Sequence, residues 1–190
     1  MITNGAICKA LEFAIRAHDG QYDKGNHPYI LHPLQVSTMV DTDEEKIVAL
    51  LHDVVEDTDC TLNDIAEALS RDFTANSYDT ELIIHAVDCI TKRKGEKYAD
   101  YIKRVCSNWL SINVKIADMT HNCDVSRLDT DVQATGLLDR LRQKYGKWLP
   151  VLLEAKAARC PVYTKGAVCL FYKEQPCPSL RECPPEGEWR

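Results

Sequence analysis

Apolar side chains recur three and four residues apart along nearly the whole chain, and this spacing constrains the fold more than any other feature. A period of about 3.6 residues puts such side chains on one face of an α-helix, whereas half-buried strands alternate apolar and polar residues. Alternation is scarce here, so the pattern predicts an all-α fold. The expected helices cover residues 4–19, 33–41, 43–57, 62–71, 79–92, 96–108, 110–126 and 131–159, with Pro150 kinking or splitting the last one.

The composition changes at Cys160. Five prolines follow it among cysteines and charged residues, and the helical period stops. A chain of 190 residues with 45% hydrophobic content is long enough for one well-buried core. We therefore expect one domain over residues 1–159 and a short irregular C-terminal tail, rich in Cys and Pro, over residues 160–190. Within the tail, residues 168–172 could form a short extended segment.

Charge and hydropathy narrow the classes of partner. The net charge is −6, which argues against a nucleic-acid backbone as the main partner, although a metal and a few local cations can still hold a small anion. No window is long and apolar enough to span a bilayer, and the N-terminal residues lack the pattern of a signal peptide. We expect no membrane partner and a cytoplasmic location.

The nine cysteines do not predict a disulfide framework. Five of them lie singly within helical patterns, where a reduced thiol acts as a small apolar side chain: Cys8, Cys60, Cys89, Cys106 and Cys123. We expect these five to fill the core. The four cysteines of the tail contain no CxxC pair, so a zinc site there is not favoured.

The run from His52 to Thr58 contains the side chains that most strongly predict a catalytic site. Thr42 followed by Glu45 is a capping box, which predicts one helix that begins there and continues through the run. On this helix the apolar side chains gather on one side, and the other side carries His52, Asp53, Glu56 and Asp57. A solvated acidic face would account for the carboxylates but not for the histidine. We favour a hydrolytic metal site.

The His52-Asp53 dyad alone offers too few ligands for a catalytic divalent ion. His32 precedes a proline that can open the next helix, and Asp118 lies in a mostly apolar helix, where a carboxylate is costly unless it is paired or metal-bound. Together these four residues offer two imidazoles and two carboxylates, a mixed set that suits Mn²⁺ or Fe²⁺. We expect structural roles for the other histidines, His18, His27, His85 and His121, with His121 at most behind the ligands.

These residues resemble a known family, the HD-type hydrolases of the RelA/SpoT stringent-response group, and in particular the stand-alone small alarmone hydrolases typified by metazoan SpoT homologues. The resemblance implies a single HD-domain helical bundle. It rests on the segments Ala17–Gln21, Pro28–Pro33, Leu51–Thr58, Val87–Lys92 and Val114–Asp118, and on the pair His121-Asn122.

The resemblance further implies an activity, a cofactor and site residues. The activity is hydrolysis of the small nucleotides ppGpp and pppGpp at the 3′ position, releasing pyrophosphate and GDP or GTP. Mn²⁺ would be held by His32, His52, Asp53 and Asp118, with Glu56 and Asp57 positioning and activating water. Substrate contacts would come from Lys24, Asn122 and Tyr145. For Lys24 and Tyr145, a surface charge and a core aromatic are the alternatives.

One departure keeps other substrates open. The family usually has an arginine that packs against guanine where this chain has Asp23. An HD phosphohydrolase acting on ppApp, another 3′-phosphorylated nucleotide or NADPH is therefore an alternative. A module that senses a nucleotide without turnover is a further one, although it would not need Glu56 and Asp57. We expect no synthetase domain, and the sequence does not predict the oligomeric state.

Overall fold

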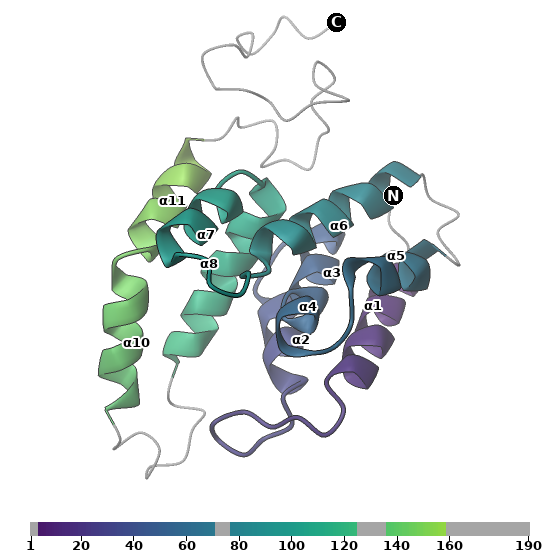
Figure 1. The fold of residues 1–190 in the computed structure, drawn as a ribbon, viewed down its shortest axis with the longest axis horizontal. Coiled ribbons are helices and arrows are strands. Elements are labelled where there is room, and N and C mark those ends of the chain that lie inside the picture. Colours follow the sequence, from purple (N-terminus) through teal and green to yellow (C-terminus); the bar gives the residue numbers. More distant parts are fainter. Residues whose placement is uncertain (1–3, 71–76, 125–135, 159–190) are drawn as a thin grey trace, which may run out of the picture.

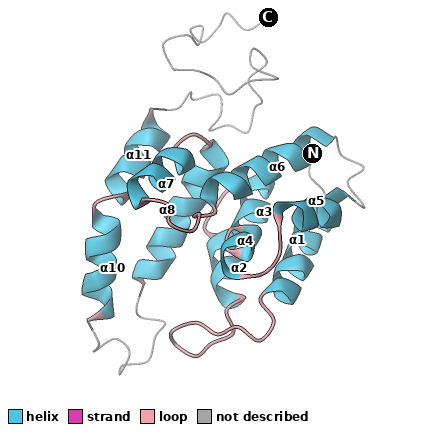
Figure 2. Ribbon diagram, in the orientation of Figure 1, coloured by secondary structure: helices cyan, strands magenta, loops and turns pink. Residues whose placement is uncertain are grey.

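The computed structural model describes residues 4–70, 77–124 and 136–158 (Figure 1). These residues form helices and loops without a strand, apart from one isolated bridge between Tyr22 and Pro28 (Figure 2). The predicted all-α fold is confirmed. The helices are α1 (Asn4–Ala17), α2 (Leu31–Thr38), α3 (Asp43–Leu51), α4 (Val54–Asp57), α5 (Leu62–Ser70), α6 (Ser77–Ile90), α7 (Tyr98–Val105), α8 (Trp109–Cys123), α10 (Leu137–Gly146) and α11 (Leu149–Ala157). The predicted tail and its extended segment lie outside the described residues.

Helix α3 lies at the centre of the larger core cluster. It packs against α1, α2, α6 and α8, and all five residues from Ile47 to Leu51 are buried. Its last five residues are therefore apolar on every side, an arrangement that is stable only when other helices surround it. The expected arrangement, with one apolar and one polar side, therefore does not apply to α3 itself.

A smaller core cluster joins α7, α8, α10 and α11, and its buried members include Tyr101, Met119, Tyr145 and Leu152. Helix α8 takes part in both clusters, since its Val114 belongs to the larger one. Figure 1 shows α10 and α11 at one side of the molecule, α1 and α5 at the other, and α3 and α8 between them. Residues on α8 therefore lie where the two clusters meet.

The expected continuous helix over residues 43–57 is wrong in its middle. Its start is confirmed, because Thr42 and Glu45 form the predicted capping box. Helix α3 then ends at Leu51, and α4 is a single turn. The cause is local: His52 Nδ1 bonds to the Ala49 carbonyl oxygen at 2.7 Å, which is the acceptor that the next helical turn would use. The chain bends at His52 and Asp53.

The other boundaries differ from the prediction by a few residues at each end. Helix α2 begins at Leu31, so Pro33 lies inside its first turn instead of opening it. The predicted last helix is two helices, α10 and α11, and Pro150 stands in the first turn of α11. A proline is tolerated there because the missing N–H would have no partner within the helix. The predicted split is confirmed.

The predicted cysteine positions are confirmed only in part. Cys89 is buried, and Cys60, Cys106 and Cys123 are half-buried. Cys8 is exposed, so its predicted place in the core is wrong. The buried face of α1 carries Ala6, Ala10 and Ala14, and a residue midway between two of these points away from the core. All five described thiols are free.

Among the described helices, none combines the length and the apolar character needed to cross a membrane.

Candidate metal centre

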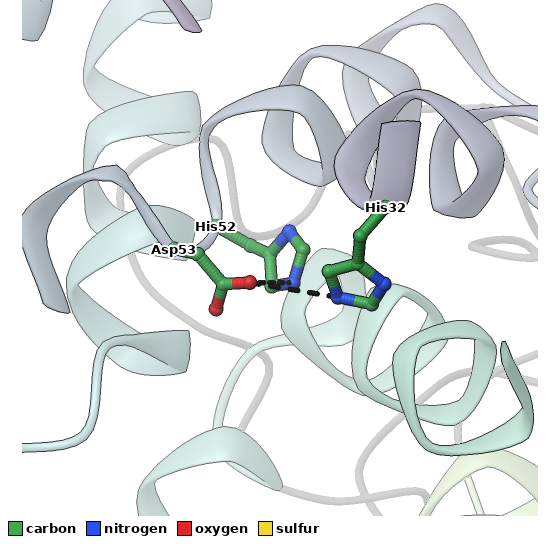
Figure 3. Close-up of side chains that lie close together, drawn as sticks. All are labelled: His32, His52 and Asp53. Atoms are coloured by element: carbon green, nitrogen blue, oxygen red, sulfur yellow. Dashed lines mark ion pairs between the residues drawn. The ribbon is translucent and has the colours of Figure 1, made fainter. Parts of the chain in front are cut away.

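Three side chains from two segments converge at the bend after α3. His52 and Asp53 form the bend itself, and His32 comes from the first turn of α2 (Figure 3). Asp53 Oδ2 lies 2.9 Å from His52 Nε2 and 3.5 Å from His32 Nε2. One donor atom from each residue lies within 4.8 Å of the other two, so this His/His/Asp group could hold a metal ion.

Asp118 brings a second carboxylate to the group from α8. Its Oδ1 lies 3.2 Å from His32 Nε2 and 3.8 Å from His52 Nε2. Its Oδ2 accepts a hydrogen bond from Lys115 Nζ at 2.7 Å. The four residues predicted as ligands are therefore close together, although they are far apart in sequence.

The tautomer of His52 tests whether this group fits a cation. A carbonyl oxygen can only accept, so His52 Nδ1 carries the hydrogen of the bond to Ala49, and the lone pair of the neutral ring is on Nε2. Nε2 is buried and makes no hydrogen bond. It lies close to Asp53 Oδ2, but this contact does not have the geometry of a hydrogen bond. A lone pair facing carboxylate oxygens is unfavourable unless a proton or a metal ion lies between them.

The electrostatics agree with a site for positive charge. Burial alone would lower the pKa of His52, but Asp53 and Asp118 outweigh it and raise the pKa to about 10. Burial alone would raise the pKa of Asp53, yet His52 and His32 hold it well below its usual range. The imidazole nitrogens and carboxylate oxygens surround one point where negative charge is in excess. Such a set of donor atoms fits a divalent cation.

His121 and Asn122 make hydrogen bonds to two of the predicted ligands, His32 and Asp118. His121 stacks on His32, with the two Nδ1 atoms 2.7 Å apart. With His32 Nε2 directed at the centre, His32 Nδ1 is the nitrogen that carries a hydrogen, so it donates to His121. Asn122 Nδ2 donates to Asp118 Oδ1 at 2.6 Å. The structure thus places the Asn122 amide on a predicted ligand, where it orients that carboxylate.

Glu56 and Asp57 follow the bend on the single turn of α4. Glu56 Oε2 accepts from the backbone N–H of Lys92 at 2.8 Å. Both side chains reach solvent, but partial burial raises the pKa of each, and the charge of Asp53 raises both further. Two carboxylates beside a candidate metal group, with a raised affinity for protons, can accept a proton from water.

Sequence reasoning missed Tyr29 and Lys115. The Tyr29 hydroxyl donates to Asp53 Oδ2 at 2.6 Å and lies 3.3 Å from Asp57 Oδ2. Burial, and then the charge of Asp53, raise the pKa of Tyr29 far above its usual range, so the hydroxyl stays protonated. The only sequence signal for these two residues was their distance from predicted ligands. Tyr29 precedes His32 by three residues, and Lys115 precedes Asp118 by three, which is about one helical turn.

The other two predicted substrate residues lie on a loop and in a core cluster. Lys24 is exposed on the loop between α1 and α2, and Tyr145 is buried in the smaller core cluster. Asp23 is turned into that loop, where its Oδ1 accepts from the backbone N–H groups of Gly25 and His27 at 2.8 and 2.9 Å. A pocket of about 350 Å³ opens beside it, lined by Asp23, His27, Leu31, His32, Leu34, Gln35 and His121.

His18 and His85 have structural contacts. His18 Nδ1 bonds to Gln21 Oε1 at 2.8 Å, and its ring packs against Tyr29. His85 lies between Cys89 and Asn108, and the Asn108 amide nitrogen is 3.1 Å from its Nδ1. Both contacts match the structural roles expected for these two residues.

The fold and the site define a helical domain built around an adjacent His-Asp pair, the HD dyad. Residues 10–77 match the family model described as HD domain. This segment, which contains His32, His52 and Asp53, is therefore similar to the HD-domain family.

Curated bacterial relatives match a larger share of the chain than the family model does. A probable guanosine-3′,5′-bis(diphosphate) 3′-pyrophosphohydrolase of Synechocystis sp. is 36% identical over 122 residues, covering 61% of this chain and 16% of that protein. A GTP pyrophosphokinase of Myxococcus xanthus is 31% identical over 134 residues, with the same coverage. The chain therefore spans about one sixth of the length of these relatives.

A solved structure has a similar fold over nearly its full length. It is a metazoan orthologue of SpoT, described as hydrolysing ppGpp and playing a role in starvation responses. The match has a TM-score of 0.60 at 20% identity and covers 88% of this chain and 99% of that one. At this identity the likeness bears on the fold alone.

Proposed function

We propose that this chain is a Mn²⁺-dependent hydrolase of the alarmones ppGpp and pppGpp, which it cleaves at the 3′ position to give pyrophosphate and GDP or GTP. One observation carries the proposal: the buried, unpartnered Nε2 of His52 faces two carboxylates directly beside Glu56 and Asp57. The names of the bacterial relatives and the fold of the metazoan ppGpp hydrolase support the choice of substrate.

In this proposal the metal ligands are His32, His52, Asp53 and Asp118. Their mixed nitrogen and oxygen donors favour Mn²⁺ over a structural zinc ion, which prefers thiolates. A bound divalent ion lowers the pKa of coordinated water and polarises a phosphoryl oxygen. Lys115 and Asn122 hold the two oxygens of Asp118, and His121 holds His32, so the ligands keep their orientation.

Glu56 and Asp57 perform the proton transfer. They orient a water molecule toward the 3′-phosphorus and accept its proton as the new oxygen–phosphorus bond forms. The bond from that phosphorus to the 3′-oxygen breaks, and the 3′-oxygen leaves as a hydroxyl after taking up a proton. Tyr29 stays protonated and donates to Asp53, which fixes that carboxylate next to Asp57.

A second candidate keeps this chemistry and changes the nucleotide. Asp23 is engaged by the backbone of its own loop, so no planar cation is available at that position to stack on guanine. This observation favours testing ppApp, other 3′-phosphorylated nucleotides and NADPH beside the guanosine alarmones. We further propose that residues 1–159 form the catalytic domain.

The test is a product assay with purified full chain and added Mn²⁺. Each nucleotide is incubated with the wild type and with Glu56→Gln, and nucleoside and phosphate products are quantified by chromatography. The proposal predicts pyrophosphate with GDP or GTP from the wild type and loss of turnover in Glu56→Gln at unchanged Mn²⁺ content. Turnover of another nucleotide alone would support the second candidate, and no turnover of any would favour a nucleotide-sensing module.

A further inference from the structure

Lys144 on α10 contacts two tyrosine rings on the side of the site that faces the smaller core cluster. Its Nζ lies 4.9 Å from the centre of the Tyr145 ring and 5.7 Å from the centre of the Tyr98 ring. It also donates to the Tyr145 hydroxyl oxygen at 3.4 Å. Lys144 is exposed, and these contacts direct its ammonium group toward the tyrosine rings of α7 and α10.

The neighbouring Tyr98 has a hydroxyl group without a partner. This oxygen is buried and makes no hydrogen bond to any of the described residues. Lys115, Asp118 and Glu56 are the charged groups that act on it, so it lies on the same side of the site. A buried hydroxyl without a partner costs stability, which a ligand can recover by accepting its hydrogen.

Lys144 feels charges of both signs but makes no close ion pair within the described residues. Burial and the cations Lys115 and Lys24 lower its pKa, whereas Asp118 and Glu56 act in the opposite direction. Within residues 4–70, 77–124 and 136–158, no carboxylate is recorded within ion-pair distance of its Nζ. An ammonium group held close to other cations, with an unused hydroxyl donor beside it, is an arrangement that binds an anion.

We propose that Lys144 and the Tyr98 hydroxyl form a subsite for a phosphate group of the substrate that does not touch the metal. Nζ of Lys144 and the hydroxyl of Tyr98 donate to the phosphate oxygens, and Tyr145 positions Lys144. The identity of the nucleotide rests on the function proposed above. The phosphate belongs either to the 3′-diphosphate, which is released as pyrophosphate, or to the 5′ end of the nucleotide.

Binding measurements test the subsite without requiring turnover. The Mn²⁺-loaded protein, freed of excess metal, is titrated with inorganic pyrophosphate and with GDP by calorimetry. In Lys144→Gln we expect at least one of the two to bind about tenfold more weakly or worse, because a hydrogen bond to a charged group is lost. Weaker pyrophosphate binding identifies the 3′-diphosphate as the group at the subsite, and weaker GDP binding identifies the 5′ phosphates.

Matched variants separate binding from folding. Lys144→Arg keeps a cation, so its affinity for both ligands should be within about threefold of the wild type. Lys147→Gln removes a nearby exposed lysine and should bind both ligands as the wild type does. Tyr98→Phe keeps the ring and should lose affinity about threefold or more at an unchanged unfolding midpoint. Wild-type affinity for both ligands in Lys144→Gln would overturn the proposal, even for a protein that hydrolyses ppGpp.

Discussion

His52 is fixed in one tautomer by the backbone. Its Nδ1 hydrogen is committed to Ala49, so rotation of the ring would cost that bond and Nε2 stays directed at Asp53 and Asp118. The side chain is 1% exposed, which leaves water little access to the lone pair. A metal ion or a proton is therefore the only species that can satisfy this nitrogen where it stands.

Metal and protons should compete at this position. Without metal, the pKa of His52 is raised to about 10, so the ring is protonated at pH 7, and Mn²⁺ must displace that proton. Affinity for Mn²⁺ should therefore rise with pH, by up to about tenfold per unit for each proton released, until the pH passes the raised pKa. Calorimetry at pH 7 in buffers of different ionisation enthalpy should detect release of at least one proton.

The exposed His27 provides the control for this experiment. His27→Ala should release the same number of protons as the wild type, because its ring lies outside the ligand group. An Mn²⁺ affinity that is independent of pH between about 7 and 9 would show that His52 is not a ligand.

Tyr29 should matter for turnover more than for folding. Tyr29→Phe removes the hydrogen bond to Asp53 and the contact with Asp57 but keeps the ring. Loss of such a supporting contact typically costs about 10- to 100-fold in metal affinity or activity. Mn²⁺ titration and steady-state kinetics would measure it. Tyr22→Phe, at a ring 63% exposed, should change neither, and full activity in Tyr29→Phe would contradict the role given to the hydroxyl.

The bend between α3 and α4 is the structural feature that makes the HD run a site. The sequence predicted the start of α3 correctly, because Thr42 and Glu45 lie close together and act locally. It did not predict the end, since the residue types alone do not show that the His52 ring bonds to the Ala49 carbonyl oxygen. Helical periodicity continues through the run and carries no sign of the break.

Glu45 should contribute strongly to the stability of α3. Its carboxylate accepts from the backbone N–H groups of Asp41 and Thr42 and from the side chain of Asn113 on α8, and the residue is 3% exposed. Glu45→Ala would leave these donors without a partner and should cost about 1–3 kcal/mol in the free energy of unfolding. Urea denaturation would measure the change.

The exposed capping box of α5 is the natural comparison for Glu45. Thr61 and Asp64 bond to each other in the same pattern, but both side chains are solvated. Asp64→Ala should therefore shift the urea midpoint much less than Glu45→Ala. Equal shifts would mean that burial and the bond to α8 add nothing to the cap.

The site lies where the two core clusters meet on α8, so its completeness depends on the fold. The four predicted ligands could be found from the sequence because a histidine or aspartate in an apolar context needs an explanation. Tyr29, Lys115 and Lys144 could not be found in this way, since a tyrosine in a turn and two lysines on helices are ordinary. Their roles depend on tertiary contacts with Asp53, Asp118 and Tyr98.

Because α2, the α3–α4 bend and α8 carry the proposed ligands, Mn²⁺ should stabilise the fold as a unit. At a free concentration of 100 times its dissociation constant, a ligand of the native state adds about 2.7 kcal/mol. For a domain of this size that corresponds to a rise in Tm of about 5–10 °C. Calorimetric scans should show this rise for the wild type and its loss in His52→Ala. An equal rise in both proteins would indicate binding elsewhere.

The central claim is that water, activated beside this metal centre, attacks the 3′-phosphorus. The most direct measurement is mass spectrometry of the products formed from ppGpp in ¹⁸O-labelled water by the Mn²⁺-loaded protein. The account predicts one ¹⁸O atom in pyrophosphate and none in GDP, with no products from Glu56→Gln. Label in GDP, unlabelled products, or full turnover by Glu56→Gln would contradict it.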